Sequence, residues 1–149
     1  MIRTIDARNP EAAQDILRIQ IPAYQIEAAL IGFDGIPPLK DTVDSIQQTN
    51  EVFLGYYHND LLAGFLSYEL EEHTYSICRL VVHPIHFRKG IAKALLEYFL
   101  NHVGQNRHIQ VSTGAKNEPA LRLYKQFEFK EVKDIEIAPD VYLTLLEKK

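Results

Sequence analysis

The stretch "VVHPIHFRKGIAKALLEYFL", residues 81–100, decides the fold of this chain. It opens as a β-branched strand, passes through a proline turn and a short basic loop, and ends as an amphipathic helix. A strand that enters a helix in this way faces the free N–H groups of the first helical turn, which form an anion site with the positive end of the helix dipole. Gly90 is the only glycine of the loop, and it lets a phosphate approach the backbone closely. The stretch therefore predicts a site for a phosphate-bearing ligand.

The charge pattern around this loop differs from that of the whole chain, which has a formal net charge of −4. No acidic residue lies between Glu72 and Glu97. The basic residues of that window are Arg79, Arg88, Lys89 and Lys93, with His73, His83 and His86. The window is interpreted either as a solvated basic face or as part of an anion site. The acidic overall charge argues against a nucleic-acid partner.

The remaining hydrophobic pattern predicts helices on the faces of a mixed sheet. Asn9 and Pro10 are typical of a helix start, and Pro22 should break or kink that helix before a second piece ends at Gly32. Further helices are predicted at residues 43–50, 91–103 and 118–127, and strands at residues 2–6, 52–57, 61–70, 74–83, 108–113, 129–137 and 141–148. The three central strands form an antiparallel meander, and the last two form a hairpin. The fold class is therefore α/β, of the mixed α+β kind.

Length and composition set the remaining limits. The 149 residues suit one domain, 1–149, with one sizeable core. No apolar run approaches the ~20 residues of a membrane span, and the N-terminus lacks the apolar region of a signal peptide. Cys78 is the only cysteine, so we expect no internal disulfide and no metal site, and a reducing cytoplasm fits best. Walker-type and dinucleotide-binding glycine motifs are absent.

The chain resembles the GNAT superfamily of acyl-CoA-dependent N-acyltransferases. The family signature [QR]-x-x-G-x-[GA] aligns with residues 87–92, where Phe87 replaces the usual Gln or Arg. "LVVHP" precedes it at the family's spacing, and the pattern N-x-x-A-x-x-L-Y follows as Asn117, Ala120, Leu123 and Tyr124. Glu128 then stands where the family usually has a glycine. The resemblance implies a GNAT-like fold with a central, mostly antiparallel sheet of about six to seven strands.

The resemblance also implies acetyl-CoA as the cosubstrate, with no metal. The predicted cosubstrate-binding residues are Leu80, Val81, Val82, Arg88, Lys89, Gly90, Ile91, Ala92, Lys93, Asn117, Ala120 and Tyr124. The loop would hold the diphosphate through backbone N–H groups. The strand would pair with the pantetheine arm as if with an added strand, and a bulge should splay it from its neighbour.

The implied chemistry is direct attack of an amine on the thioester through a tetrahedral intermediate. Val82 would donate its N–H to the oxyanion, and Tyr124 matches the family's general acid to the CoA sulfur. The general base stays open: Ser76 and Ser112 stand at the positions where some relatives carry a glutamate, and the candidates are Tyr24, Glu27, Glu69 and His83. A water chain, or an amine that arrives already neutral, would also suffice. A covalent route through Cys78 is disfavoured because no basic partner is evident beside it.

The predicted acceptor site is built from the first two helical segments, the loop at residues 31–41 and the final hairpin at residues 135–143. These segments combine acidic and aromatic residues, which suit a cationic primary amine of a small molecule or peptide. Its candidates are Tyr24, Glu27, Phe33, His83 and Tyr142, with Asp34. The runner-up interpretation is a non-catalytic acyl-CoA-binding or regulatory module. We expect no nucleic-acid or membrane partner, and the resemblance implies a homodimer.

Overall fold

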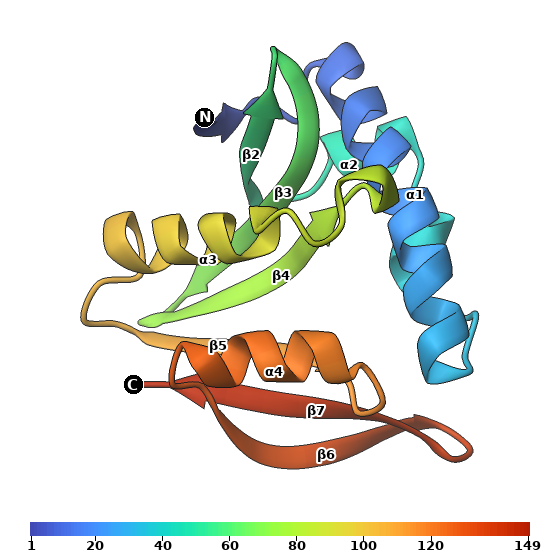
Figure 1. Cartoon of the computed structure of the whole chain (residues 1–149), viewed down its shortest axis with the longest axis vertical. Coiled ribbons are helices and arrows are strands. Elements are labelled where there is room, and N and C mark those ends of the chain that lie inside the picture. The colour runs from blue at the N-terminus through green and yellow to red at the C-terminus, as the bar shows by residue number, and fades with distance from the viewer.

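The computed structural model describes residues 1–149 and contains a single seven-stranded sheet with helices on both faces (Figure 1). The strands are β1 (Ile2–Ile5), β2 (Val52–His58), β3 (Leu61–Glu71), β4 (Thr74–Val82), β5 (His108–Gly114), β6 (Lys130–Ala138) and β7 (Val141–Lys148). The helices are α1 (Pro10–Ile31), α2 (Val43–Gln47), α3 (Ile91–His102) and α4 (Glu118–Gln126), with the short 3₁₀ turns η1 (Pro37–Lys40) and η2 (Pro84–His86). None of these helices combines the length and the apolar character that crossing a membrane requires.

The strand order is β1-β2-β3-β4-β5-β7-β6, and every neighbouring pair is antiparallel except β4 with β5. This confirms the predicted mixed, mostly antiparallel sheet of six to seven strands. The single parallel pair sits in the middle of the sheet, where the chain leaves β4 and returns to β5 through α3 (Figure 1). A parallel connection needs such a crossover, and the crossover begins at the loop that the sequence singled out.

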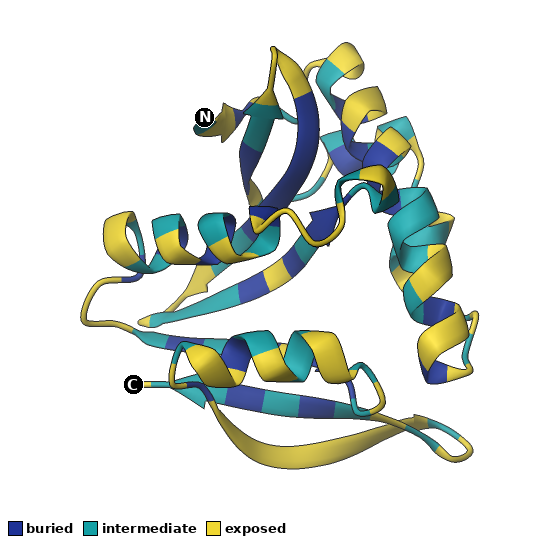
Figure 2. Ribbon diagram, in the orientation of Figure 1, coloured by how far each residue is buried: buried dark blue, intermediate teal, exposed yellow.

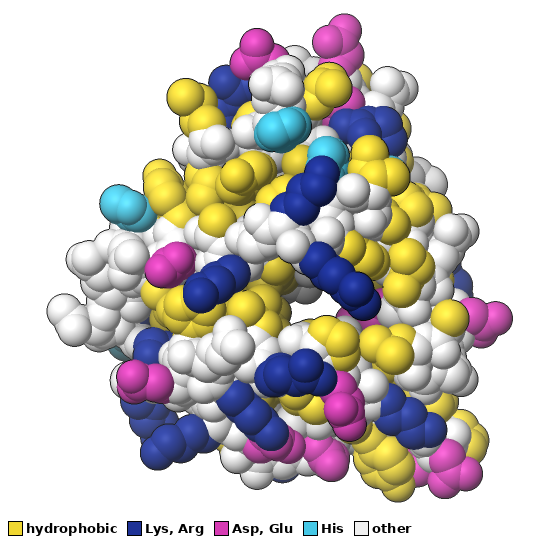
Figure 3. Space-filling view, in the orientation of Figure 1, with side chains coloured by type: hydrophobic (Ala, Val, Ile, Leu, Met, Phe, Trp, Pro, Cys, Tyr) yellow, Lys and Arg dark blue, Asp and Glu magenta, His cyan; other side chains and the backbone are white.

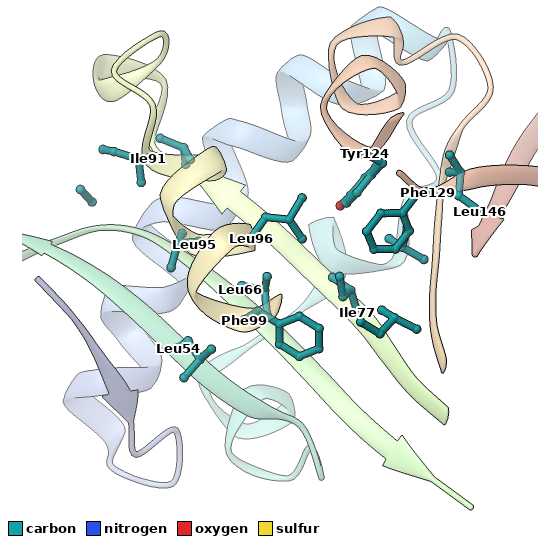
Figure 4. Close-up of a cluster of buried hydrophobic side chains, with 14 residues drawn as sticks. Leu54, Leu66, Ile77, Ile91, Leu95, Leu96, Phe99, Tyr124, Phe129 and Leu146 are labelled. Carbon is teal, nitrogen blue, oxygen red and sulfur yellow. The ribbon is translucent and has the colours of Figure 1, made fainter. Parts of the chain in front are cut away.

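Two hydrophobic clusters hold the helices to the sheet. The larger cluster joins α3 and α4 to the strands and includes Leu95, Phe99 and Leu146, each fully buried (Figure 4). The second cluster joins α1 and α2 to β1–β4 through Ile16, Ile19 and other buried apolar residues. By contrast β6 is exposed along almost its whole length (Figure 2). The two clusters place α1 and α3 on opposite faces of the sheet, so β4 lies between them.

The helix α1 is continuous from Pro10 to Ile31, so of the predicted break or kink at Pro22 the break is wrong. The proline removes one backbone hydrogen bond. The apolar stripe nevertheless continues on both sides of it, because Ile16 and Ile19 before it and Ala28 and Ile31 after it are all buried. Packing of this stripe outweighs the local cost of the proline. The predicted ends are confirmed: Asn9 accepts hydrogen bonds from the N–H groups of Glu11 and Ala12, and Gly32 ends the helix in the left-handed conformation.

Glu128, which replaces the family's glycine, has a left-handed backbone with φ of 71° and is exposed. A residue with a Cβ atom is strained in this conformation by roughly 1–2 kcal/mol, whereas glycine is not, although glycine loses more entropy on folding. We therefore expect Glu128→Gly to raise the free energy of unfolding by about 0.5–1 kcal/mol, measured by urea denaturation. The control Arg122→Gly, at an exposed position inside α4, should lower it by about 1 kcal/mol. A lower free energy of unfolding in Glu128→Gly would contradict the inference that the left-handed backbone of Glu128 is strained.

Candidate active site

The site begins where β4 and β5 separate. The two strands pair in parallel only from Thr74 with His108 to Ile77 with Val111. The register of β4 against β3 shifts at Cys78, because Ser67 is opposite Arg79 whereas Tyr68 is opposite Ile77. An extra residue of this kind bends its strand and increases the local twist. The predicted bulge and splay of β4 are therefore confirmed, and a slot opens between the C-terminal half of β4 and β5.

The backbone of β4 presents unused donors to this slot. The His83 N–H donates to the Ala63 carbonyl of the neighbouring chain segment at 2.9 Å. Successive residues of an antiparallel strand direct their N–H groups to opposite sides, so the N–H groups of Leu80 and Val82 point away from β3. β5 has already diverged from β4 at these positions. The two amides can therefore pair with an extended, amide-bearing ligand.

The loop between η2 and α3 forms a second set of donors at the end of the slot. Gly90 precedes the helix with φ of 77°, and Arg88 also has a positive φ, 64°. No side chain caps α3, and its first hydrogen bond runs from the Ala94 N–H to the Gly90 carbonyl. The N–H groups of the first turn are thus free, and left-handed residues beside a helix start form concave anion sites. A Cβ atom placed on Gly90 would meet nothing within 4 Å, so the space in front of it is open.

We expect Gly90→Asp to weaken binding of coenzyme A about tenfold, measured by calorimetry, which corresponds to ~1.4 kcal/mol. The new carboxylate would stand in the open space of the loop and repel a diphosphate there. Aspartate tolerates the left-handed backbone, so the fold should be retained. The control Gly90→Asn has the same shape without the charge, and it should bind more tightly than the aspartate variant. Equal affinities for the two variants would show that charge at this position does not face the ligand.

A cavity of about 550 Å³ connects these donors to the middle of the molecule. The predicted residues that line it are Tyr24, Glu27, Phe33, Leu80, Val82, Arg88, Gly90, Ile91, Ala92, Lys93, Asn117, Ala120 and Tyr124. A second cavity, of about 410 Å³, shares Tyr24, Glu27, Leu80, Val82 and Asn117 with the first and adds Val81. The space-filling view shows the opening between the two halves of the molecule, with Lys and Arg side chains on its rim (Figure 3). The site is therefore accessible through this face.

Tyr124 extends from α4 into the space between α4 and β4. Its ring packs edge-on against Phe129 with centroids 5.5 Å apart, and its hydroxyl oxygen is directed away from Phe129 (Figure 4). Burial, and secondarily the negative charge of Glu27, raise the pKa of Tyr124 well above its usual value. The hydroxyl therefore keeps its proton at neutral pH and is a donor, not a base.

Glu27 joins α1 to the start of α4. Its Oε1 accepts a hydrogen bond of 2.6 Å from Asn117 Nδ2, while Asn117 Oδ1 accepts from the Ala120 N–H at 3.3 Å. Asn117 therefore caps α4 and contacts Glu27 at the same time. Burial raises the pKa of Glu27, although the hydrogen bond from Asn117 works in the opposite direction. Burial and then Glu27 also raise the pKa of Tyr24, which lies in the same group.

Four of the sequence's candidates lie away from the cavity. Lys89 and Asp34 are exposed, and Tyr142 is 42% exposed on β7. The His83 imidazole accepts a hydrogen bond from the Ile85 N–H at 3.2 Å, so it caps η2. These four do not come together with the others. The side chain of Val81 also packs into the core under α1, so only its backbone is near the slot.

Glu69, a candidate for the general base, and Ser76, which stands where some relatives carry a glutamate, are not placed to act as bases. Glu69 does not line the cavity, and the Ser76 hydroxyl accepts a hydrogen bond from Gln110 at 2.9 Å. Cys78 lines the cavity, and partial burial with the carboxylates of Glu51 and Glu69 raises the pKa of its thiol to about 12. Such a thiol is protonated at neutral pH, which agrees with the prediction against a covalent cysteine route.

Arg79 corrects the interpretation of the basic window. It is buried, and its guanidinium forms two hydrogen bonds with Glu51, at 3.0 and 3.1 Å, one with Asp41 at 2.9 Å and one with Gln20 at 2.9 Å. Its charge is therefore matched inside the protein and is not available to an anion. The sequence carried a signal for this: Arg79 has the same strand parity as the buried Val81.

The apolar wall of the cavity comes from residues 31–41 and 135–143, the two segments that the sequence predicted as parts of the acceptor site. Ile31 at the end of α1, the η1 segment, and Ile137 and Leu143 of the last hairpin all line it. The wall residues are Ile31, Phe33, Ile36, Pro37, Pro38, Ile137 and Leu143. Phe33 is the one wall residue that the sequence analysis named individually. Each of the others is ordinary in its local pattern, so only their convergence on one space identifies them.

The family model described as "Acetyltransferase (GNAT) family" matches residues 14–129, which is most of the chain. The chain belongs to this family. The chain is also 43% identical, over 145 residues, to the UPF0157 protein YqkA of Bacillus subtilis. That match covers 97% of this chain but only 42% of YqkA, so the chain spans less than half the length of this relative.

The GNAT fold is seen again in solved structures of low sequence identity. The smu.2055 protein of Streptococcus mutans superposes with a TM-score of 0.80, at 18% identity and with 99% of this chain and 98% of that chain covered. The PaiA N-acetyltransferase of Thermoplasma acidophilum, solved with coenzyme A, superposes with a TM-score of 0.78 at 18% identity. The match covers 100% of this chain and 98% of that chain. The ribosomal-protein-S18-alanine N-acetyltransferase of Escherichia coli superposes with a TM-score of 0.78 at 15% identity. The match covers 99% of this chain and 91% of that chain. These likenesses concern the fold.

Proposed function

We propose that this GNAT chain is an acetyl-CoA-dependent N-acetyltransferase that acetylates a primary amine of a small molecule or peptide. One observation carries the proposal: the Tyr124 hydroxyl lies in the same cavity as the free N–H groups of β4 and the uncapped start of α3. Anion donors, amide-pairing donors and a protonated acid thus share one space. That combination suits a ligand with a diphosphate, an amide-bearing arm and a thioester.

The residues present suit each part of acetyl-CoA. The loop of Arg88 and Gly90 offers backbone donors and positive charge for the diphosphate. Leu80 and Val82 offer N–H groups to the pantetheine amides, in the manner of strand addition. The Val82 N–H then stands near the end of the arm, where it would stabilise the oxyanion. The solved PaiA N-acetyltransferase, which is similar in fold, contains coenzyme A and lends support to this choice of cosubstrate.

Tyr124 would protonate the departing sulfur. Its raised pKa keeps the proton in place until a thiolate forms nearby. Burial disfavours the charged form of a thiol as it does that of a phenol, so a thiolate formed in this cavity would also be a stronger base than in water. The two proton affinities are therefore raised together, and the transfer from oxygen to sulfur is not penalised by the burial of the tyrosine. The single cysteine, Cys78, suits a cytoplasmic protein.

Calorimetry and a thiol assay test the function together. Acetyl-CoA and desulfo-CoA should both bind to the protein, and a panel of amines should release free thiol with at least one member. No binding of either ligand at millimolar concentration would overturn the proposal. Binding with no thiol release from the panel would favour the runner-up, an acyl-CoA-binding module without turnover.

A further inference from the structure

Glu27 is the only acidic side chain that lines the main cavity. The cationic side chains on the same lining are Arg79, Arg88 and Lys93. The charge of Arg79 is matched by Glu51 and Asp41, and the other two belong to the loop and first turn of α3. A single carboxylate therefore faces a cavity that otherwise offers neutral and positive groups.

No lysine, arginine or histidine forms an ion pair with Glu27; the ion pairs of the protein lie elsewhere. Its one hydrogen-bond donor is the neutral amide of Asn117, at 2.6 Å. The second carboxylate oxygen has no protein partner and is accessible from the cavity. A carboxylate that lines a cavity without a cationic partner from the protein attracts a cation that enters the cavity from outside.

We propose that Glu27 binds the ammonium group of the acceptor and takes its proton, and that this acceptor is a monoamine carried on an apolar body. The inference rests on the proposed function and names the acceptor class and the proton acceptor of the same site. Glu27 lines both cavities, and so does Asn117. The carboxylate is also near enough to Tyr124 and Tyr24 for its charge to raise the pKa of each.

The rest of the cavity explains why the acceptor has one charge and an apolar body. Beyond Glu27 the wall is formed by Ile31, Phe33, Ile36 and the two prolines of η1, with Ile137 and Leu143 opposite. A second ammonium group would be buried against these side chains with no carboxylate to receive it. A polyamine is therefore disfavoured, whereas an aromatic or aliphatic body gains from contact with the wall.

The proton balance closes with the groups present. An ammonium gives one proton to the Glu27 carboxylate and becomes a neutral amine, which attacks the thioester carbon. The carbon–sulfur bond then breaks, the thiolate takes the Tyr124 proton, and the second proton lost by the nitrogen restores Tyr124. Glu27 finally releases its proton to solvent. The sum is one acetylated amine, one free thiol and one proton.

The groups around Glu27 set the direction of its pH dependence. Tyr24 on α1 and Tyr124 on α4 stay neutral, and Asn117 is uncharged. The cationic residues of the lining are Arg79 on β4, Arg88 before α3 and Lys93 in the first turn of α3. Glu27 must be ionised to accept a proton, so kcat/KM should rise with pH through its raised pKa. The raised pKa also means that the folded state holds this proton more tightly than the unfolded state. The ionised carboxylate therefore costs folding stability, and this cost sets in as the pH rises.

The test compares Glu27→Gln with the control Asp15→Asn, an exposed residue of the same helix. The glutamine can still accept the hydrogen bond from Asn117 but has no charge. Calorimetry on protein saturated with coenzyme A should show that 2-phenylethylamine binds the wild type at least tenfold more tightly than spermidine or 2-phenylethanol does. Glu27→Gln should lose this binding at least tenfold, with the affinity for coenzyme A unchanged. Asp15→Asn should behave as the wild type.

Turnover and stability complete the test. With 2-phenylethylamine, kcat/KM should fall about 10²-fold in Glu27→Gln, and the acidic limb of its pH profile should disappear. The melting temperature of Glu27→Gln at pH 8 should equal or exceed that of the wild type, since a costly charge is removed.

Unchanged amine binding, preference for spermidine, a persisting acidic limb, or a lower melting temperature with weaker coenzyme A binding would overturn the assignment. Glu27-dependent amine binding without any thiol release would instead refute the proposed acetyl transfer and leave the ammonium site standing.

Discussion

We expect Arg79→Ala to lower the free energy of unfolding by about 3–5 kcal/mol, measured by urea denaturation followed by circular dichroism. The guanidinium is 9% exposed and is the shared partner of Glu51 and Asp41, whose side chains are 11% and 15% exposed. Removing it leaves two nearly buried carboxylates facing each other without a cation. A domain of ordinary stability, about 5–15 kcal/mol, would lose a large share of its margin.

The size of this effect follows from how many elements meet at Arg79. Gln20 on α1 bonds the guanidinium and also donates to the Pro38 carbonyl of η1 at 2.9 Å, and the Ser67 hydroxyl on β3 donates to Glu51 at 2.5 Å. Burial alone would lower the pKa of Arg79, but Glu51 and Asp41 raise it above its usual value, so the charge is permanent. One residue thus ties α1, η1 and β3 to β4.

The control is Arg122→Ala, whose guanidinium is 72% exposed and lies 4.0 Å from Glu118. Exposed pairs of this kind contribute about 0–1 kcal/mol, so the control should change stability little. Arg79→Met, which restores apolar volume without charge, should be nearly as destabilised as Arg79→Ala. If the free energy of unfolding falls by less than about 1 kcal/mol in both Arg79 variants, the carboxylates of Glu51 and Asp41 are hydrated in the absence of the guanidinium.

We expect Tyr124→Phe to reduce turnover about 10³-fold, or ~4 kcal/mol in the activation barrier, while the affinity for coenzyme A changes less than twofold. The substitution removes the proton donor to the leaving sulfur and keeps the ring against Phe129. Thiol release under saturating substrates measures the first quantity, and calorimetry the second. Because the pKa of Tyr124 is raised, the wild type should show no loss of rate on the alkaline side up to about pH 9.

Tyr98→Phe is the matched control, since this half-buried tyrosine of α3 packs against the same core but does not line the cavity. Its turnover should equal that of the wild type. A Tyr124→Phe variant with unchanged turnover would remove Tyr124 as the acid. A variant with weakened coenzyme A binding and lowered stability would make its hydroxyl a structural group.

The sequence was most informative where the signal is local. Strand alternation, helical spacing and the capping residues Asn9, Gly32 and Asn117 predicted the helices and strands close to their observed bounds. Each of these signals acts over a few residues, through backbone hydrogen bonds and side-chain periodicity. For the same reason the free donors before α3 were readable from one glycine in a basic loop.

The errors arose where a distant element outweighed the local pattern. Pro22 is a strong local breaker, yet α1 continues, because its buried residues before the proline pack on the sheet and Ala28 and Ile31 after it pack with Ile36. Arg79 belongs to a basic window in the sequence, yet its partners Asp41 and Glu51 lie 38 and 28 residues away. Neither outcome can be derived from a window of neighbouring residues.

The sequence by itself determined the element order and the strand–loop–helix connection at Gly90, and it predicted Gly90 and Tyr124 as site residues. Only the tertiary structure decided which charges are free. It paired Arg79 with Asp41 and Glu51 inside the protein. It also brought Glu27 into contact with Asn117, 90 residues away in the sequence, on the wall of a cavity that no other acidic residue lines. The physical reason is that backbone conformation depends on near neighbours, whereas the cost of a buried charge depends on whatever side chains the fold brings around it.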